Sequence, residues 1–423
     1  MLDQPPTGTQ YARPTEDGKF IVGGMKLDRP FRIRRLGHFG FNVYNYDDAV
    51  RFYTDLLGFD ISDARSYEFR LNPEQIARLQ ATGGSSWGCF TRYGTDHHAF
   101  VLFSRHLREV ADPPGRWRPG VTVNQVTWQV GSLGEVGDAA RWLTATGQAM
   151  LRTGRDMPGS NWHTYFSDPD GHPMELYWGM EQIGWNGHSK PRNMYSRAFQ
   201  AAPPLPQMAE FDEVEEALRG GTQVTDGFRH TQRPPARYDV QGQMLPRPFK
   251  IVRIGPVRLF VADMAAALKF YTETMGFTLT ETIDYRGHTC AFLRTAGEHH
   301  VLALYPLALR ALLGLPDNTT CLNFGLQLAN YQQLRDARDF LAANGVRFAE
   351  LPPELFPGVD YAFDAVDPDG HRVQLYHAIE QVGFDGRPRQ GAARRTPAPP
   401  PWPLAIDYEP DSFIGEPYLG PWG

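Results

Sequence analysis

The sequence is poor in cysteine, in long apolar runs and in excess positive charge, and each shortage excludes a class of protein. Its three cysteines, Cys89, Cys290 and Cys321, form no CxxC pair, which argues against a disulfide scaffold and a thiolate zinc site. No apolar run is long enough to cross a bilayer, and the start MLDQPPTGTQ lacks the features of a signal peptide. The 42 lysines and arginines against 48 acidic residues argue against nucleic acid as a partner. We therefore expect a cytoplasmic protein without membrane contact.

At 423 residues the chain is long enough for two or three domains of roughly 150 residues each. Three stretches rich in proline and polar residues lack the pattern of a folded core and are interpreted as connecting segments. They are an N-terminal arm (1–30), a linker with one short helix beginning near Ala209 (191–248), and a proline-rich tail with scattered aromatics (391–423). We expect the tail aromatics to pack on a surface of the protein.

The two remaining blocks, 31–190 and 249–390, repeat each other. Three motifs occur in both blocks in the same order, with changes in spacing that loop insertions would cause. The pairs are DDAVRFYTDLLGF (from Asp47) and MAAALKFYTETMGF (from Met264), DHHAFVLF (from Asp96) and EHHVLALY (from Glu298), and DPDGHPMELYW (from Asp168) and DPDGHRVQLYH (from Asp367). Three matches in one order indicate an internal duplication. The DPDG sequence is typical of a tight hairpin turn, so His172 and His371 are assigned to turn stabilisation.

Each block divides again into two units with the same order of elements: one strand, one helix and about three further strands. In the first block, strand patterns occur at 34–43, Tyr67–Leu71, Gly88–Tyr93, Ala99–Ser104 and 123–130, helical patterns at Asp47–Leu57 and 134–147, and a hairpin pattern at 162–178. One unit cannot bury its sheet alone. We therefore expect an α+β fold in which four βαβββ units pair into two cup-shaped domains.

Paired βαβββ units with a histidine on the opening strand (LGHFGFNV) and a glutamate on the closing strand (MELYW) resemble the vicinal oxygen chelate superfamily, which has the glyoxalase/bleomycin resistance/dioxygenase fold. Within it, the first block most resembles the type I extradiol ring-cleavage dioxygenases. The resemblance covers both blocks, but its chemical motifs occur only in the first. It implies a facial triad of two histidines and one carboxylate that holds Fe(II), with open positions for a catecholate and O₂.

The resemblance assigns metal-ligand positions to three residues of the first block. His38 is at the first histidine, Glu175 is at the carboxylate, and Gln125 occupies the place of the second histidine. An amide oxygen is neutral like imidazole but is a harder and weaker donor, so Mn(II) becomes a competitor of Fe(II). Three alternatives stay open at this point: Gln125 leaves the site without metal, His38 is a hydrogen-bonded core histidine, or Glu175 faces solvent.

The same resemblance assigns catalytic roles to further residues. His98, with His97 beside it, is at the position of a histidine that acts as acid and base near bound O₂. Tyr165, ten residues before Glu175, is at the position of a tyrosine that holds the substrate. His163 is a third candidate, because a strand period of two places it on the same face as Tyr165.

The second block departs from this ligand pattern at every position. Pro256, Phe324 and Gln374 stand at the first, second and carboxylate ligand positions, and Asp364 replaces the tyrosine. This block keeps a histidine pair, His299–His300, so the pair in the first block also admits a structural role. We therefore expect the second block to be a supporting domain.

Three classes of function fit these features. The first, which we predict, is an extradiol-type dioxygenase that cleaves a catecholic ring with O₂ at a mononuclear non-haem Fe(II) site. The others are a non-oxidative metal-dependent lyase, isomerase or hydrolase of the same superfamily, and a metal-free small-molecule binding protein. His98 and Tyr165 favour the first class, whereas Gln125 favours the other two. The expected partners are O₂ and a small aromatic, catechol-like substrate, and the oligomeric state stays open, a homo-oligomer included. Aromatic residues of the first block suit a planar ring: Trp87, Phe90, Trp128, Trp162 and Tyr165.

Overall fold

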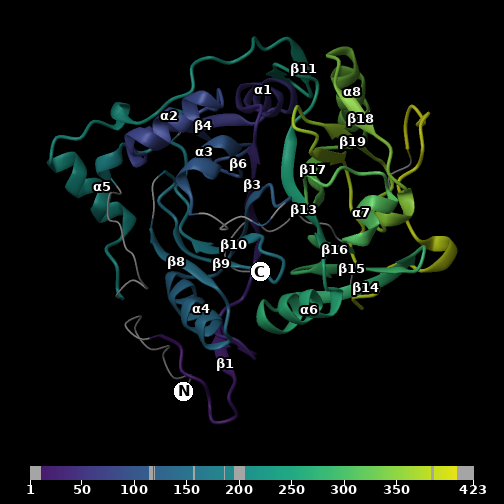
Figure 1. The fold of residues 1–423 in the computed structure, drawn as a ribbon, viewed down its shortest axis with the longest axis horizontal. Coiled ribbons are helices and arrows are strands. Elements are labelled where there is room, and N and C mark those ends of the chain that lie inside the picture. The colour runs from purple at the N-terminus through teal and green to yellow at the C-terminus, as the bar shows by residue number, and fades with distance from the viewer. Residues whose placement is uncertain are drawn as a thin grey trace.

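The computed structural model contains two eight-stranded mixed sheets, one in each block, that have the same strand order (Figure 1). The structure describes residues 11–113, 118, 120–155, 158–184, 186–194, 205–382 and 385–406. The first ten residues of the arm and residues 407–423 of the tail therefore lie outside the described ranges. No helix within these ranges is long and apolar enough to cross a membrane.

The first sheet is assembled from two units that meet in its middle. Its strands are β3 (Arg35–Val43), β4 (Asp60–Ser66), β5 (Trp87–Arg92), β6 (Phe100–Ser104), β7 (Val123–Gln129), β8 (Met150–Arg155), β9 (Trp162–Ser167) and β10 (Pro173–Trp178), in the order β4-β5-β6-β3-β7-β10-β9-β8. The opening strands β3 and β7 pair antiparallel with each other, and each pairs parallel with the closing strand of its own unit, β6 or β10. The helices are α1 (Tyr46–Arg51), continued by a π-helix (Phe52–Leu57), α3 (Arg105–Ala111) and α4 (Leu133–Ala145).

The second sheet repeats this arrangement. Its strands are β13 (Ile251–Val261), β14 (Thr278–Tyr285), β15 (His288–Arg294), β16 (Leu302–Pro306), β17 (Cys321–Leu328), β18 (Arg347–Ala349), β19 (Ala362–Val366) and β20 (Arg372–Tyr376), in the order β14-β15-β16-β13-β17-β20-β19-β18. Its helices are α6 (Met264–Lys269), continued by a π-helix (Phe270–Thr274), α7 (Ala308–Leu312) and α8 (Tyr331–Ala343). The predicted α+β fold of four βαβββ units in two cup-shaped domains is confirmed.

One predicted strand of the first block is wrong. Tyr67–Leu71 is a short 3₁₀ turn (Glu68–Arg70), and the helix α2 (Pro73–Ala81) follows it. Asn72 ends the extended pattern because its side chain caps α2 and Pro73 occupies the first helical position. In the second block a two-residue turn joins the equivalent strands β14 and β15. Residues 67–86 therefore form an insertion that only the first block contains, and we call it the first-block insertion.

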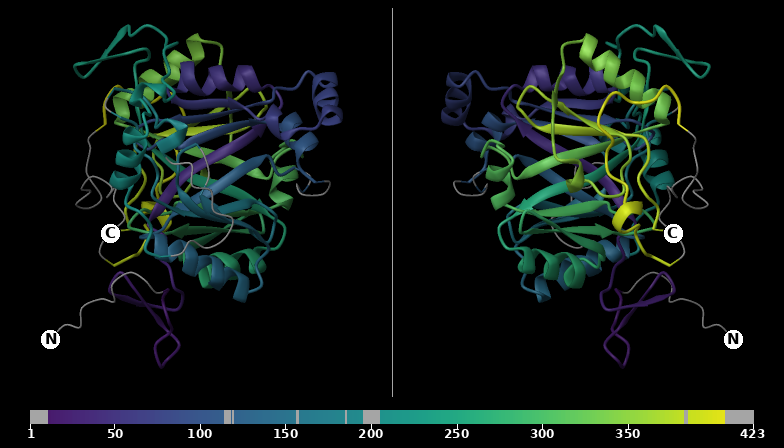
Figure 2. Two further views of the ribbon diagram at one scale, coloured as in Figure 1. Left: turned by 90° about the vertical axis from the view of Figure 1, so that its left-hand side faces the viewer. Right: turned by 90° about the vertical axis from the view of Figure 1, so that its right-hand side faces the viewer.

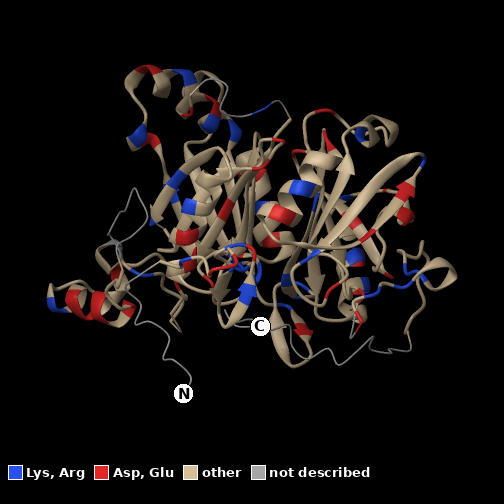
Figure 3. Ribbon diagram, turned by 90° about the horizontal axis from the view of Figure 1, so that it is seen from below, with Lys and Arg blue, Asp and Glu red and all other residues tan. Residues whose placement is uncertain are grey.

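The connecting segments contain small elements of their own. These are two hairpins, β1 (Phe20–Val22) with β2 (Met25–Leu27) and β11 (Tyr238–Val240) with β12 (Gln243–Leu245), the helix α5 (Glu210–Arg219), and the 3₁₀ turns Arg192–Met194, Val224–Asp226, Pro353–Leu355 and Gly391–Ala393. The β1–β2 hairpin projects away from the body of the molecule (Figure 2). In the tail, the ring of Trp402 packs against Tyr361 at 5.7 Å, as expected for tail aromatics. Basic and acidic residues are interspersed along the ribbon of both domains (Figure 3).

Four buried hydrogen bonds in two reciprocal pairs join the domains, and we call this set the cross-domain clasp. They join Tyr53 Oη to Asp367 Oδ2 (3.1 Å), Tyr271 Oη to Asp168 Oδ2 (2.8 Å), His172 Nε2 to Thr320 Oγ1 (2.8 Å) and His371 Nε2 to Thr122 Oγ1 (2.9 Å). His172 also contacts Asp168 within its own turn, at 2.8 Å. The turn histidines thus stabilise the turns, as predicted, and in addition join the domains. The duplicated FYT and DPDGH motifs bind each other across the interface.

The clasp predicts a measurable cost for removing one tyrosine hydroxyl. Tyr271→Phe and Tyr53→Phe should each lower the free energy of unfolding by about 1–3 kcal/mol, because each removes a donor from a buried aspartate. Tyr44 provides the control, since its hydroxyl bonds Glu109 at the exposed surface, and Tyr44→Phe should cost less than about 0.5 kcal/mol. Urea unfolding followed by circular dichroism measures all three variants. Equal losses at buried and exposed tyrosines would contradict a stabilising role for the clasp.

Candidate functional site

A row of side chains crosses the first sheet on one face. It runs, strand by strand, through His38 (β3), Thr127 (β7), Glu175 (β10), Tyr165 (β9) and Arg152 (β8). Side chains of residues that are paired in register project to the same side of a sheet. The structure thus brings His38, Glu175 and Tyr165 together, although up to 137 residues separate them in the sequence.

Glu175 is fully buried, and neutral donors and imidazoles surround its carboxylate. Its partners are His38 Nε2 (2.9 Å to Oε2), Thr127 Oγ1 (2.8 Å to Oε2), Asn161 Nδ2 (2.8 Å to Oε1) and His163 Nδ1 (3.9 Å to Oε1). Burial raises the pKa of Glu175, but the imidazole of His38 and the other donors outweigh it and lower the pKa to about 2. Within the described ranges, no lysine or arginine forms an ion pair with Glu175. The site therefore contains a buried anion, and a solvent-facing Glu175 is excluded.

Gln125 and Tyr165 extend the site on the same face of the sheet. Gln125 lies two residues before Thr127 on β7, and the residue is 9% exposed. The Tyr165 hydroxyl donates a hydrogen bond to Gln125 Oε1 (3.3 Å), and it is close enough to the Glu175 carboxylate to donate to it instead. The ring of His163 lies 4.9 Å from the ring of Tyr165. The Tyr165 hydroxyl thus links the amide oxygen of Gln125 to the buried anion.

His98 adjoins this set from the chain segment just before β6. Its ring lies 4.4 Å from the ring of His38, and its Nδ1 atom is 3.0 Å from Nδ1 of His97. Burial, with His38 and His97 nearby, lowers the pKa of His98 well below its usual value, so its imidazole is neutral. Gly159 permits this packing, because a Cβ atom there would lie 2.8 Å from His98 Cε1.

The donor atoms of the site could hold one divalent metal ion. Within the described ranges, no three His, Cys, Asp or Glu side chains form a metal-binding cluster, so a third ligand must come from another residue type. His38 Nε2 and Glu175 Oε2 are 2.9 Å apart, as expected for adjacent ligands about 2.1 Å from one ion at about a right angle. Gln125 Oε1 would complete a set of one nitrogen and two oxygens. Such a set suits Fe(II) and, because of its two oxygens, also Mn(II).

The equivalent row in the second sheet corrects one sequence alignment. Gly325, Gln374 and Asp364 pair in register as Thr127, Glu175 and Tyr165 do in the first sheet. Asn323, two residues before Gly325, therefore matches Gln125, whereas the sequence comparison assigned Phe324 to that position. Phe324 is on the opposite face of β17, where its ring stacks on Phe39 at 4.3 Å. A one-residue shift in register moves a side chain to the other face of a sheet.

The second cup contains an arginine where the first has a glycine. Arg258 is fully buried and pairs in register with Asn323, as Gly40 pairs with Gln125. Its Nη1 atom donates to Asn323 Oδ1 (3.0 Å), and Asn323 Nδ2 donates to Asp364 Oδ1 (2.6 Å). A guanidinium thus supplies the positive charge in this cup. Together with Pro256 and Gln374 at two of the ligand positions, it accounts for the loss of the triad in the second block.

A cavity of about 260 Å³ opens beside the site in the first cup. His98, Gln125, Asn161, His163 and Tyr165 line it on the polar side, and Tyr67, Phe90 and Phe103 line it with aromatic rings. His38 and Glu175 are buried behind these polar residues. Of the aromatics that the sequence associates with a planar ring, Phe90 and Tyr165 line the cavity, but Trp128 is in the core and Trp87 is 46% exposed. Sequence reasoning missed Asn161 and Thr127, for which no motif gave a signal.

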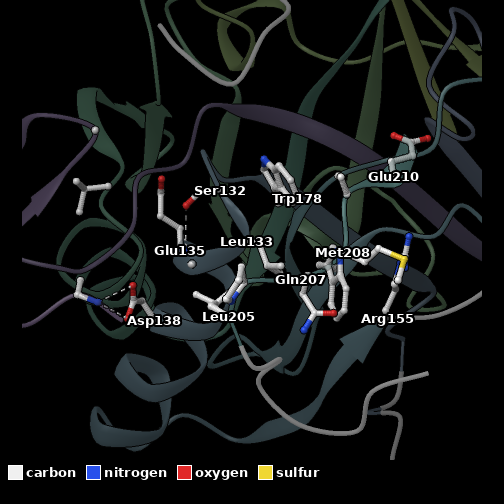
Figure 4. A pocket seen from close by; sticks show the side chains of 18 of the residues that line it. Ser132, Leu133, Glu135, Asp138, Arg155, Trp178, Leu205, Gln207, Met208 and Glu210 are labelled. Carbon is white, nitrogen blue, oxygen red and sulfur yellow. Dashed lines mark hydrogen bonds between the residues drawn. The ribbon is translucent and has the colours of Figure 1, made fainter. Parts of the chain in front are cut away.

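A larger cavity, of about 610 Å³, lies beside α4 and the chain that leads into α5 (Figure 4). Trp162 and Trp178 line it, and Trp162 is on the face of β9 opposite to His163. Its charged groups are already paired: Arg155 forms a buried ion pair with Glu213 (2.7 Å), and Asp138 accepts the amide of Ala12 (3.1 Å). The smaller cavity is therefore the candidate active site, because it adjoins the buried carboxylate and the histidines.

Comparison with protein families agrees with this geometry. A sequence model of the Glyoxalase/Bleomycin resistance protein/Dioxygenase superfamily matches residues 35–176 and 253–375. The chain therefore belongs to this superfamily. No curated protein matches the sequence at a significant level.

Solved structures of several enzymes share the fold at low sequence identity. The 2,3-dioxygenase LapB from Pseudomonas sp. KL28 is 16% identical, with a TM-score of 0.51 over 90% of this chain and 97% of that one. An extradiol ring-cleaving dioxygenase from B. fuscum is 15% identical, with a TM-score of 0.52 over 85% and 75% of the two chains. A Mn(II)-bound glyoxalase from Novosphingobium aromaticivorans is 16% identical, with a TM-score of 0.50 over 84% and 85%. At these identities the likeness establishes the fold.

The lowered pKa of Glu175 predicts a pH-dependent contribution to the stability of the metal-free protein. The contribution is fully present above the ordinary pKa of 4.5 and is lost as the pH falls toward 2. From about pH 5 to about pH 3, the free energy of unfolding of the parent should therefore fall by about 2 kcal/mol more than that of Glu175→Gln. Urea unfolding in the presence of a chelator measures the difference. Parallel pH curves for the two proteins would show that Glu175 has an ordinary pKa.

Proposed function

We propose that the protein is an extradiol-type dioxygenase that cleaves a catecholic ring with O₂ at a mononuclear non-haem Fe(II) site in the first domain. The proposal rests mainly on the buried Glu175 carboxylate, which lies 2.9 Å from His38 Nε2. In the described ranges, no arginine or lysine forms an ion pair with it. A buried carboxylate that no lysine or arginine balances is costly, and a metal ion held between Glu175 and His38 would balance its charge. The ligands in this proposal are His38, Gln125 and Glu175.

When bound, Fe(II) would polarise the two oxygens of the diol and relay electrons from the diol to O₂. The residues of the chain would bind and orient the substrate and move its protons. His98, held neutral by burial, can take a proton from a substrate hydroxyl at Nε2 and return it later. Tyr165 and His163 can hydrogen-bond a substrate oxygen, and the ring of Phe90 lines the place where an aromatic substrate would pack.

A non-oxidative metal-dependent lyase, isomerase or hydrolase of the same superfamily is the second candidate. Gln125 favours it, because an amide oxygen replaces an imidazole and makes the ligand set harder. The fold shared with a Mn(II)-bound glyoxalase is compatible with this candidate. His98 beside His38 favours the dioxygenase, since it places a neutral base next to the proposed ligands.

The proposed ligand set predicts one divalent metal ion per chain. Glu175→Ala should abolish binding, because it removes the only anionic ligand of the set, whereas the matched change Gln374→Ala in the second cup should leave binding unchanged. Gln125→His should keep or tighten Fe(II) binding, because imidazole is the better donor for this ion. Metal analysis after anaerobic loading and dialysis measures the stoichiometry of each protein. Two ions per chain, or loss of metal from Gln374→Ala, would contradict the assignment, and absence of metal from the loaded parent would favour a metal-free binding protein.

The proposed reaction predicts O₂ uptake and a yellow ring-fission product when the Fe(II)-loaded protein meets catechols in air. His98→Ala should lower turnover by about 10² to 10⁴ while metal content stays intact, because it removes the acid–base group. His300→Ala, the same change in the second cup, should leave turnover unchanged once circular dichroism shows that the variant is folded. An Fe(II)-loaded protein that binds catechols without consuming O₂ would exclude the dioxygenase and leave the non-oxidative candidate.

A further inference from the structure

The turn that leads into β9 contains a residue with strained backbone. Ser160 has a φ of +48°, in the left-handed region that residues other than glycine rarely adopt. In the described ranges, Gln241 and Arg286 also have a positive φ, but each belongs to a two-residue hairpin turn, where this conformation is ordinary. Ser160 is in a longer connection, between the end of β8 and the start of β9. Such strain persists only where the surrounding structure holds it, and it is common at functional sites.

The strained turn contacts the candidate site at two points. Asn161, the residue after Ser160, donates from Nδ2 to Glu175 Oε1 (2.8 Å). Gly159, the residue before it, packs against the ring of His98. Because Asn161 bonds Oε1, the carboxylate keeps its other oxygen, Oε2, on the side of His38. The turn thus fixes the orientation of the carboxylate at the place where the metal ion would bind.

The second cup contains the equivalent turn without the strain. Asp364 matches Tyr165, and the residue five positions before it is Val359. Val359 therefore takes the place of Ser160, and its φ is not positive. The next residue, Asp360, forms an ion pair with an arginine of the tail. The strained conformation thus occurs in the cup that has the candidate site.

Arg155 holds the strained turn from the end of β8. It is buried, with 6% of the residue exposed, and it lies at the edge of the larger cavity (Figure 4). Its Nε atom donates to the backbone carbonyl of Ser160 (2.8 Å). Its two Nη atoms donate to the two carboxylate oxygens of Glu213 on α5 (2.7 and 2.9 Å). This bidentate pair fixes the plane of the guanidinium, so a helix of the linker determines where Arg155 holds the turn.

From these contacts we propose that Arg155 is a positioning residue of the metal site, and the inference rests on that part of the proposed function. Arg155 holds the carbonyl of Ser160, and the turn then presents Asn161 to Glu175. Removal of a group that orients a metal ligand through hydrogen bonds typically lowers metal affinity by about 10- to 100-fold. The linker, through Glu213, therefore contributes to metal affinity from outside the cup.

Calorimetric titration of the full, chelator-treated chain with Mn(II) tests the inference without O₂ or catechol. Arg155→Met/Glu213→Leu removes the bond to Ser160 together with both members of the buried ion pair, and it should weaken Mn(II) binding by about tenfold. Ser160→Val should cause a similar loss, because a β-branched residue disfavours a positive φ, whereas Ser160→Gly should keep the affinity of the parent. The matched control is Arg395→Met, which breaks the ion pair of Asp360 in the equivalent turn and should leave the affinity unchanged.

A double-mutant cycle separates positioning from a general effect on folding. Asn161→Ala should weaken Mn(II) binding by about tenfold. Adding Arg155→Met/Glu213→Leu to it should cause little further loss, because both changes act through the same hydrogen bond to Glu175. Losses that multiply, or the affinity of the parent in both Arg155→Met/Glu213→Leu and Ser160→Val, would overturn the inference.

A crystal structure of metal-free Arg155→Met/Glu213→Leu tests the positioning itself, also if the parent binds no metal. It should show Ser160 outside the left-handed region and Asn161 no longer bonded to Glu175, and an unchanged turn would overturn the inference. Mn(II) affinities as expected, in a protein that consumes no O₂ with catechols, would support the inference while the dioxygenase falls. O₂ uptake by the parent, with equal Mn(II) affinity in parent and variants, would overturn the inference while the dioxygenase stands.

Discussion

The two halves of the protein depend on each other through one buried aspartate in each DPDG turn. Asp168 accepts a hydrogen bond from Tyr271 of the second half, and Asp367 accepts one from Tyr53 of the first. A buried carboxylate is costly unless its oxygens are hydrogen-bonded, so each turn relies on a donor from the other half. Strand β10 begins five residues after Asp168. The clasp therefore also holds in place the strand that carries Glu175.

The two duplicated cups differ in the charge of their buried polar groups. The first contains a buried anion, Glu175, among imidazoles and neutral donors, and a cavity adjoins it. The second contains a buried cation, Arg258, whose guanidinium is tied through Asn323 to Asp364. An anion among exchangeable donors can accept a metal ion, whereas a guanidinium already supplies the positive charge. The two cups thus share one scaffold, and the buried anion with an adjoining cavity occurs in the first cup.

Local patterns predicted the elements well where the chain follows a simple period. The strand around His38 and the helix 134–147 have clear periods of two and of 3.6, and both were found. Tyr67–Leu71 also alternates, but Asn72 and Pro73 begin a helix directly after it, and a capping signal outweighs a short alternation. The incorrect assignment of Phe324, in place of Asn323, to the second ligand position has another cause. Both residues are on the same strand, and its pairing with β20, 49 residues further along, determines which of them faces the cup.

The sequence by itself determined the duplication, the four βαβββ units and the candidates His38, Gln125, Glu175, His98 and Tyr165, because motifs and periods are properties of neighbouring residues. Only the tertiary structure decided that His38 and Glu175 are 2.9 Å apart, that Asn161 and Thr127 donate to the same carboxylate, and that Arg258 fills the second cup. It also placed His98, Gln125 and Tyr165 at one cavity. These contacts depend on strand register and on packing between distant segments, and both are set by burial and hydrogen bonding over the whole fold.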